Sequence, residues 1–584
     1  MKKILSIIFA VIISLALVTG ISTPADVKGA SFETSGEIDY SQDSAKVSGI
    51  KYYYKDSYFY KDAYCYNDSL STMSLCMSIA AFNSGSEPEY KDKSKNIKKL
   101  YAELDFEDIY VNPDYEKKPS RDSIGVAMAN KKLVDDRGKT FTLVAAAIRG
   151  GGYEKEWADN VTIGKSGAAS GFSASATKVF ECIKKYIEGN TKGDIKIWLT
   201  GYSRGGAVAG LTGRMFDDLS DSDTDISREN IYVYTFEAPA AEDIEKADNK
   251  IYKNIFNIVN PDDIVPKVVM NYWGCKRPGE DIWLPSVQTD SDYRTKKILM
   301  QKHFDTISGK KAVQNSDFIK KNNKPVGVYC DEFLRSISQD VFKDRKDYSD
   351  NYESLIADMM EEITGNNSDG NYTVSLQNLM KINAMLLKAS KDTDRKMNIN
   401  SLEDINSIYA DSKYIVQNHY PEICLAWLMS FDKNYAGENI NTGIEDNKAG
   451  YSEVRISSKK LKKITVFDGG GNEAACISGN KVINRRTDGI VCDYDNGDSI
   501  FYLPLNRKYT INAIAKSKCK VSVVVNEYSF DTSQYSKVYS AKNINLKKAK
   551  TISVTLGKSK AKHIAENSDT VYIIKNGKKQ IKTA

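Results

Sequence analysis

The chain has 584 residues, which exceeds the size of a single hydrophobic core and indicates two or more domains. A content of 41% hydrophobic and 27% charged residues excludes an intrinsically disordered chain. The net charge of +5 is unevenly distributed, because residues 451–584 carry 25 Lys and Arg against 11 Asp and Glu, whereas residues 1–450 are net acidic.

The N-terminal segment has the pattern of a secretory signal peptide. Lys2 and Lys3 precede an apolar run from residue 4 to residue 18, and small residues follow at Gly29 and Ala30. A membrane anchor is the alternative, but the run is shorter than the ~20 apolar residues that span a bilayer. We therefore expect residues 1–30 to be removed and the protein to be secreted into the extracellular space.

Helical and strand-like patterns alternate in the first half of the chain. Leu70, Met73 and Met77 have helical spacing, and a second helix follows near residues 95–104. Apolar runs typical of buried strands then alternate with amphipathic helices. The strands are expected at 140–148, 194–200, 231–239 and 252–260, and the helices at 172–189 and 205–219. This order indicates βαβ units and an α/β fold with a mostly parallel sheet.

The pattern changes after Pro266. Residues 270–350 have no clear period, and helices are then expected at 351–365, at 374–390 and from Pro421 onward. Beyond residue 450, short alternating runs separated by turn residues are typical of a small all-β unit. The expected organisation is an α/β domain at 31–440, with a helical N-terminal part at 60–130 and a helical insertion at about 270–415, followed by a basic β-rich domain at 450–584.

The basic C-terminal unit and the cysteines bear on partners and cofactors. A basic face can bind a cell-wall or anionic membrane surface; the alternative is a solvated face that binds nothing. We expect no nucleic-acid partner. Nine cysteines are an odd number for an exported chain, so at least one is expected to be free or to pair between molecules. Cys182 is expected to be a buried free thiol. No cysteine or histidine pair has metal-ligand spacing. We expect neither a metal nor an organic cofactor.

A Gly-x-Ser-x-Gly pattern marks a candidate nucleophile. Gly201-Tyr202-Ser203-Arg204-Gly205 follows one expected strand and opens one expected helix, as a nucleophile elbow does. Glycines at the flanking positions let the strained turn pack between strand and helix. The sequence therefore predicts that Ser203 is a nucleophile at a helix N-terminus; a plain glycine-rich turn is the alternative.

A serine nucleophile needs a base, and the chain has three histidines. His563 lies in the basic β-rich unit and is most simply a surface residue. His303 lies in an ordinary-looking helical setting. His419 lies in a polar loop just before a strongly apolar helix, where a base can be held at the edge of a packed element. We favour His419 over His303, since triads are defined by geometry and not by spacing.

The acid and the oxyanion hole have candidates in two further loops. Asp262 and Asp263 end an apolar strand after the serine, where the acid of such an enzyme is expected, although either can merely cap or turn the chain. One backbone donor for the oxyanion is expected from Arg204, directly after the nucleophile. The other is expected from the glycine-rich loop after an earlier strand, at Gly151 or Gly150.

Together these stretches resemble the class 3 (fungal-type) lipase family of the α/β-hydrolase superfamily. The family has a strand ending in Arg-Gly-Thr near a Trp, a helix-opening Gly-Phe, a Gly-His-Ser-Leu-Gly-Gly elbow, Thr-Phe-Gly-x-Pro, and Asn-x-x-Asp-x-Val-Pro. The matching residues are Arg149-Gly150-Gly151 with Trp157, Gly171-Phe172, 201–206, 235–239 and 260–266. The resemblance implies Ser203 as nucleophile, Asp263 as acid and Gly151 at the oxyanion position, and a His-x-Pro-Glu motif supports His419.

The chain also departs from the family pattern. The resemblance covers about residues 135–270 and the His419 segment, and leaves the basic β-rich unit outside. The replacements are Gly151 for threonine, Tyr202 for histidine, Arg204 for leucine and Glu237 for glycine. The Gly151 replacement removes a side-chain hydroxyl from the oxyanion hole. More than 150 residues separate Asp263 from His419, and this insertion is expected to form a lid or cap, or only to pack.

These observations lead to one expectation and two alternatives. We expect a secreted serine hydrolase that cleaves carboxylic esters of lipids through a Ser-Asp-His triad and an acyl-enzyme. The first alternative is an acyltransferase on the same fold, which transfers the acyl group to a sugar or lipid alcohol. The second is a non-catalytic cell-surface binding protein in which the basic β-rich unit is the active part.

Overall fold

The structure is a computed structural model of the chain. It describes residues 31–42, 45–82, 93–116, 123–150, 170–220, 226–243, 247, 251–267, 275–287, 293–308, 315–322, 325–336, 411, 414–415, 417–442, 444, 450–485, 490–495, 497–505, 507–529, 534–556, 573–576 and 579–582. The expected signal peptide and the helices expected at 351–365 and 374–390 lie outside these residues.

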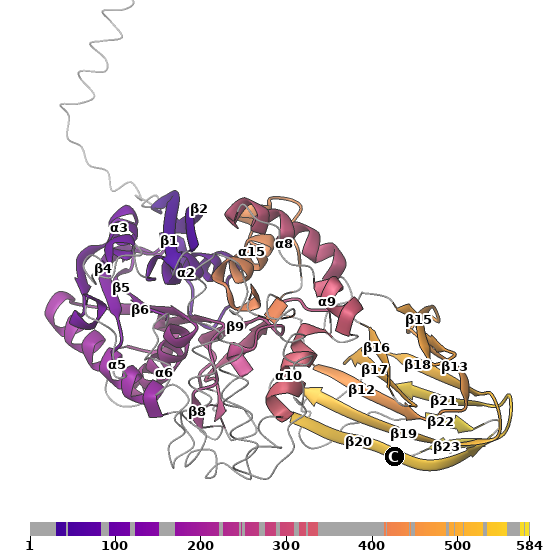
Figure 1. Cartoon of the computed structure of the whole chain (residues 1–584). Coiled ribbons are helices and arrows are strands. Elements are labelled where there is room, and N and C mark those ends of the chain that lie inside the picture. Colours follow the sequence, from indigo (N-terminus) through magenta and orange to yellow (C-terminus); the bar gives the residue numbers. More distant parts are fainter. Residues whose placement is uncertain are drawn as a thin grey trace, which may run out of the picture.

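A seven-stranded sheet forms the centre of the α/β body (Figure 1). Its order is β11-β9-β7-β6-β5-β4-β3; β11 to β5 run parallel, and β4 and β3 are antiparallel to their neighbours. The strands are β3 Glu107–Val111, β4 Val126–Val134, β5 Thr140–Ile148, β6 Ile195–Tyr202, β7 Ile231–Phe236, β9 Ile255–Val259 and β11 Glu280–Trp283. The expected α/β fold with a mostly parallel sheet is therefore confirmed.

Helices cover both faces of this sheet. The helices α5 (Ser170–Asn190) and α6 (Arg204–Leu219) share one apolar cluster with Leu199, and α2 (Asp68–Ala80) shares another with Trp198. Neighbouring strand residues point to opposite faces, so Trp198 and Leu199 belong to different clusters. This burial on both faces explains the uninterrupted apolar runs of β5, β6 and β7.

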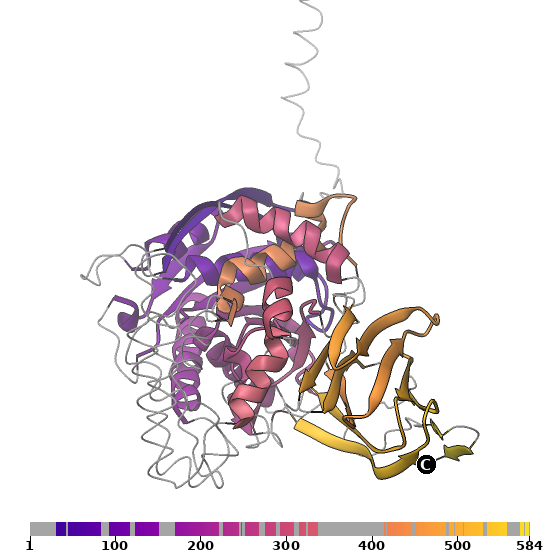
Figure 2. The same ribbon diagram turned by 45° about the vertical axis from the view of Figure 1, so that its right-hand side comes forward.

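Two helices extend the layer on the α2 side. The helix α8 (Tyr293–Ser308) lies beside α15 (Pro421–Phe431) in Figures 1 and 2, and their Tyr293 and Trp427 rings are 5.9 Å apart. The remaining α-helices among the described residues are α3 Lys95–Glu103, α9 Asn315–Asn322, α10 Val326–Ser336 and α16 Lys433–Ala436. Among the helices that the structure describes, none has the length and hydropathy needed to cross a membrane.

Several elements have no clear signal in the sequence. Residues 60–130, expected to be helical, contain β3 and the start of β4 as well as α2 and α3. Strand β4 lacks an apolar period because Lys131 is buried in it and donates to Asp56 Oδ1 at 3.0 Å. Residues 270–350, expected to be irregular, contain β11, α8, α9 and α10. The structure also contains two small antiparallel pairs that the sequence did not predict. The first is a hairpin of β1 Glu33–Gln42 and β2 Ala45–Lys55. The second pairs β8 Glu242–Asp243 with β10 Cys275–Lys276.

The C-terminal residues form two antiparallel sheets. Their orders are β16-β17-β12-β19-β20 and β15-β14-β13-β18-β21-β22-β23, and the inner faces share one apolar core. The strands are β12 Gly450–Ser457, β13 Leu461–Phe467, β14 Glu473–Ser478, β15 Lys481–Arg485, β16 Val491–Asp495, β17 Asp498–Pro504, β18 Tyr509–Ala515, β19 Cys519–Ser529, β20 Gln534–Leu546, β21 Thr551–Leu556, β22 Ile573–Asn576 and β23 Lys579–Lys582. Figure 2 shows these sheets at one side of the α/β body. That they form a separate domain stays a prediction.

The cysteines make no disulfide. All nine lie in described residues, and none of them is part of a disulfide. Eight of them are buried or partly buried within the α/β body and the C-terminal sheets; they are Cys76, Cys182, Cys275, Cys330, Cys424, Cys476, Cys492 and Cys519. Cys182 on α5 is only partly buried, whereas the sequence predicted a buried thiol.

A buried carboxyl group on α6 makes the stability of the α/β body depend on pH. The Asp217 Oδ1 atom accepts a hydrogen bond from Asn254 Nδ2 at 3.0 Å, and its Oδ2 atom is buried without a hydrogen-bond donor. Burial raises the pKa of Asp217 to about 8. Between pH 4 and pH 8 the folded chain therefore retains a proton that the unfolded chain releases. Each unit by which the pH rises in this range lowers the free energy of unfolding by up to about 1.4 kcal/mol.

We predict that Asp217→Asn stabilises the protein increasingly as the pH rises from 4 to 8, because the amide cannot ionise. Thermal unfolding of the variant and of the parent across this range measures the difference in Tm. The exposed Asp194→Asn is the control and should change Tm little at any pH. A Tm difference for Asp217→Asn that stays constant from pH 4 to pH 8 would show that Asp217 is ionised in the folded protein.

Candidate active site

The segment 201–205 forms a sharp turn between β6 and α6. Ser203 has φ 54° and ψ −122°, a backbone conformation that costs a non-glycine residue about 1–3 kcal/mol. A Cβ atom at Gly201 would lie 2.2 Å from the Gly205 carbonyl oxygen, so no side chain fits there. The Ser203 N–H donates to the Phe236 carbonyl oxygen at 2.8 Å and so fixes the turn against β7. The strand, turn and helix thus hold a strained serine at the carboxyl edge of the sheet.

The imidazole ring of His419 lies between Ser203 and Asp263. Its Nε2 atom is 3.0 Å from Ser203 Oγ, and its Nδ1 atom is 2.7 Å from Asp263 Oδ2. A proton on Nδ1 that is donated to the carboxylate leaves Nε2 as the acceptor for the serine proton. Asp263 is fully buried, and its Oδ1 atom accepts the Val265 N–H at 2.9 Å. The structure therefore brings together the residues that the sequence predicted as nucleophile, base and acid.

Side chains next to the triad hold the His419 loop in place. The Tyr202 hydroxyl donates to the His419 carbonyl oxygen at 2.8 Å, and the two rings lie 5.5 Å apart. Asn260 Nδ2 donates to the Asn418 carbonyl oxygen at 3.2 Å. No role for Tyr202 follows from the sequence alone. Its only signal was that tyrosine stands where the family pattern has histidine.

The other candidates for base and acid lie elsewhere. Asp262 Oδ1 accepts the Gly327 N–H at 3.1 Å, near the start of α10. His303 lies on α8, where burial lowers its pKa and its Nε2 atom has no hydrogen-bond partner in the described structure. His563 lies outside the described residues. Within the part of the chain that the structure describes, His419 is thus the histidine in contact with Ser203.

The expected oxyanion hole is described in part. Arg204 is the first residue of α6, so its N–H lies at the helix N-terminus beside Ser203. Gly151 lies outside the described residues, but the neighbouring Gly150 is described. A Cβ atom at Gly150 would lie 2.9 Å from the Tyr202 carbonyl oxygen. The loop after β5 therefore starts directly beside the elbow.

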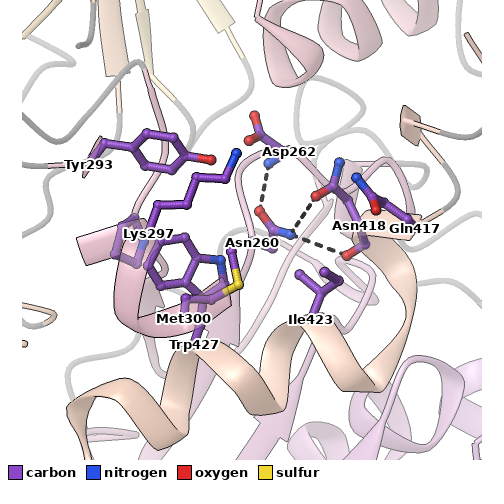
Figure 3. A pocket seen from close by; sticks show the side chains of 10 residues that line it. Asn260, Asp262, Tyr293, Lys297, Met300, Gln417, Asn418, Ile423 and Trp427 are labelled. Carbon is purple, nitrogen blue, oxygen red and sulfur yellow. Dashed lines mark hydrogen bonds between the residues drawn. The ribbon is translucent and has the colours of Figure 1, made fainter. Parts of the chain in front are cut away.

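A small cavity lies beside the Asn260–Asn418 contact (Figure 3). Lys297, Met300 and Trp427 also line it, and burial lowers the pKa of Lys297. Its volume of about 10 Å³ holds roughly one water molecule and no ester substrate. The described residues contain no group of three or more His, Cys, Asp or Glu side chains that could hold a metal ion.

A known family model matches part of the α/β core. The family model described as lipase (class 3) matches residues 136–273. No curated protein sequence matches the chain.

Solved structures of lipases are also similar to this chain. One is a triacylglycerol lipase described as having a serine protease triad at its catalytic centre, with 18% identity over 38% of this chain and 82% of that chain, and a TM-score of 0.27. Another is Rhizomucor miehei lipase in complex with its propeptide, with 20% identity over 38% and 67% of the two chains and a TM-score of 0.25. A third is lipase II from Rhizopus niveus, with 17% identity over 37% and 82% and a TM-score of 0.26.

The segment that matches the family contains the elbow, β9 and the Asp263 position just beyond β9. The resemblance inferred from five short motifs is therefore confirmed at the level of the family. Residues 136–273 of the chain match the class 3 lipases, and this match supports a carboxylic ester hydrolase.

Proposed function

We propose that the protein hydrolyses ester bonds of lipids with Ser203 as nucleophile, His419 as base and Asp263 as the acid that orients the histidine. The observation that carries the proposal is the continuous line of contacts from Asp263 Oδ2 to His419 Nδ1, at 2.7 Å, and from His419 Nε2 to Ser203 Oγ, at 3.0 Å. Both distances lie within the range expected for a base that takes a proton from a nucleophile.

The reaction proceeds in two halves. In the first, His419 Nε2 takes the Ser203 hydroxyl proton while Ser203 Oγ attacks the ester carbonyl carbon, and the histidine then returns the proton to the leaving alcohol. In the second, His419 takes a proton from water while the water oxygen attacks the acyl carbon; the bond to Ser203 Oγ breaks, the fatty acid leaves, and His419 returns the proton to Ser203 Oγ. The buried Asp263 carboxylate stabilises the positive charge that His419 carries between these proton transfers.

Charge on the substrate oxygen is stabilised at the N-terminus of α6. The Arg204 N–H directly follows Ser203, and a backbone N–H from Gly151 supplies the second donor of the proposed oxyanion hole. The helix dipole favours negative charge at this position. The strained turn of Ser203 places its hydroxyl within reach of the His419 base at the N-terminus of α6.

We predict that a fluorophosphonate probe labels the purified protein and that Ser203→Ala abolishes the labelling. His419→Ala and Asp263→Asn should lower kcat for p-nitrophenyl esters by roughly 10,000-fold, because each removes one member of the proton-transfer line. His303→Ala is the matched control and should retain both labelling and hydrolysis. Labelling that survives in Ser203→Ala, or that is lost in His303→Ala, would contradict the proposed roles.

We also predict that Tyr202→Phe lowers kcat about 5- to 10-fold with little change in KM, because the His419 carbonyl oxygen loses a hydrogen-bond donor worth about 1 kcal/mol. Tyr101→Phe is the control, since the Tyr101 hydroxyl donates to the Ala127 carbonyl oxygen at 3.0 Å in the buried core. Steady-state kinetics and Tm measured on both variants separate the two effects. Equal kcat in the two variants would assign Tyr202 to stability alone.

A further inference from the structure

Glu237 occupies a position that is unfavourable for a glutamate in two respects. It follows β7 with φ 48°, a conformation that glycine adopts without strain and that costs other residues about 1–3 kcal/mol. Its side chain is fully buried, where a charged carboxylate is expensive. The family pattern has glycine at this position, so the chain retains a strained and buried acid where the fold itself does not need one.

The contacts of Glu237 place it against the acid of the triad. Its Oε2 atom accepts the Asn260 N–H at 2.9 Å, whereas its Oε1 atom is buried and has no hydrogen-bond donor. The Asp263 carboxylate lies close enough for its charge to raise the pKa of Glu237. The backbone supports this placement, because the Glu237 N–H donates to the Ile258 carbonyl oxygen at 2.9 Å, on the strand that leads to Asp263.

Two facing carboxyl groups in a buried site cannot both be ionised, so one of them holds a proton. Both oxygens of Asp263 already have partners that favour the carboxylate, namely the Val265 N–H and His419 Nδ1. Glu237 has one backbone donor for its two oxygens, the Asn260 N–H on Oε2. The proton therefore belongs on Glu237, and its acceptor is the Asp263 carboxylate.

The surroundings of Glu237 favour its neutral form. Burial, followed by the charge of Asp263, raises the pKa of Glu237 well above its usual range. The other titratable groups close by are Cys424 on α15, which contacts the carboxyl group, and Tyr202. Burial raises the pKa of both of these groups as well, so neither carries a negative charge at neutral pH.

We propose that Glu237 is a positioning residue of the active site: its protonated carboxyl group donates a hydrogen bond to the Asp263 carboxylate and holds it against His419. The proposal rests on the proposed function of Ser203, His419 and Asp263. The hydrogen bond fixes the carboxylate in the orientation that His419 Nδ1 requires. It also reduces the negative charge on the Asp263 oxygens, so the carboxylate stabilises the protonated form of His419 less strongly.

The test compares Glu237→Gln with Glu237→Met in the full chain. The glutamine can donate to Asp263 through its amide and accept from the Asn260 N–H, whereas the methionine has a similar size and no donor. We expect Glu237→Gln to keep kcat for a p-nitrophenyl ester within about threefold and Glu237→Met to lose roughly 10- to 100-fold, with KM nearly unchanged in both. The acid limb of the kcat/KM profile should move to higher pH in Glu237→Met and stay in place in Glu237→Gln.

A second measurement tests the proton itself. A neutral buried acid contributes stability below the pH at which the unfolded glutamate ionises, and this contribution falls as the pH rises. The Tm of the parent should therefore decrease relative to that of Glu237→Gln between pH 5 and pH 8. A constant difference would show that Glu237 is ionised in the folded protein and would overturn the proposal.

Should Glu237→Met fail to fold, Glu237→Gly replaces it in the kinetic comparison, because glycine relieves the backbone strain at this position and also lacks a side-chain donor.

The outcomes separate this proposal from the proposed function. Equal kcat and equal pH profiles in Glu237→Gln and Glu237→Met, together with complete loss of hydrolysis in Ser203→Ala, would overturn the role of Glu237 and leave the triad intact. A drop in Tm without a change in kcat would assign Glu237 to structure alone. Hydrolysis that persists in Ser203→Ala would overturn both the proposed function and the role of Glu237.

Discussion

The arrangement of this site depends on the burial of one carboxylate, Asp263. A buried charge without partners is costly, so the surrounding chain must supply hydrogen bonds and an opposing group. The Val265 N–H and His419 Nδ1 meet this requirement, and the second contact joins positions 156 residues apart in the chain. This contact holds the loop before α15 against the segment that follows β9, although the two are far apart in the sequence.

The parallel sheet explains why these groups can meet. The strands β6, β7 and β9 are neighbours and run in the same direction, so their carboxyl ends lie along one edge. Ser203 follows β6, Glu237 follows β7 and Asp263 lies just beyond β9. Polar residues that the sequence separates by about 30 positions therefore become neighbours, which is the usual reason that sites form at this edge of an α/β sheet.

The replacements relative to the family pattern are concentrated around the triad. Tyr202 stands for histidine and bonds the His419 backbone, and Glu237 stands for glycine and faces Asp263. Each adds a polar group to a buried region, where polar groups are normally paired with a hydrogen-bond partner. The differences from the family are therefore linked by contacts in space, although they appear as isolated substitutions along the chain.

The sequence by itself determined the α/β fold, the turn at Ser203 and the family, because apolar periodicity and glycine spacing record interactions between residues close in the chain. It missed β4, whose buried Lys131 depends on Asp56, a distant partner. It favoured His419 over His303 without a contact to decide between them, and the catalytic roles stay predictions. Only the tertiary structure placed His419 beside Ser203, because that contact spans 216 residues and depends on how the sheet and α15 pack.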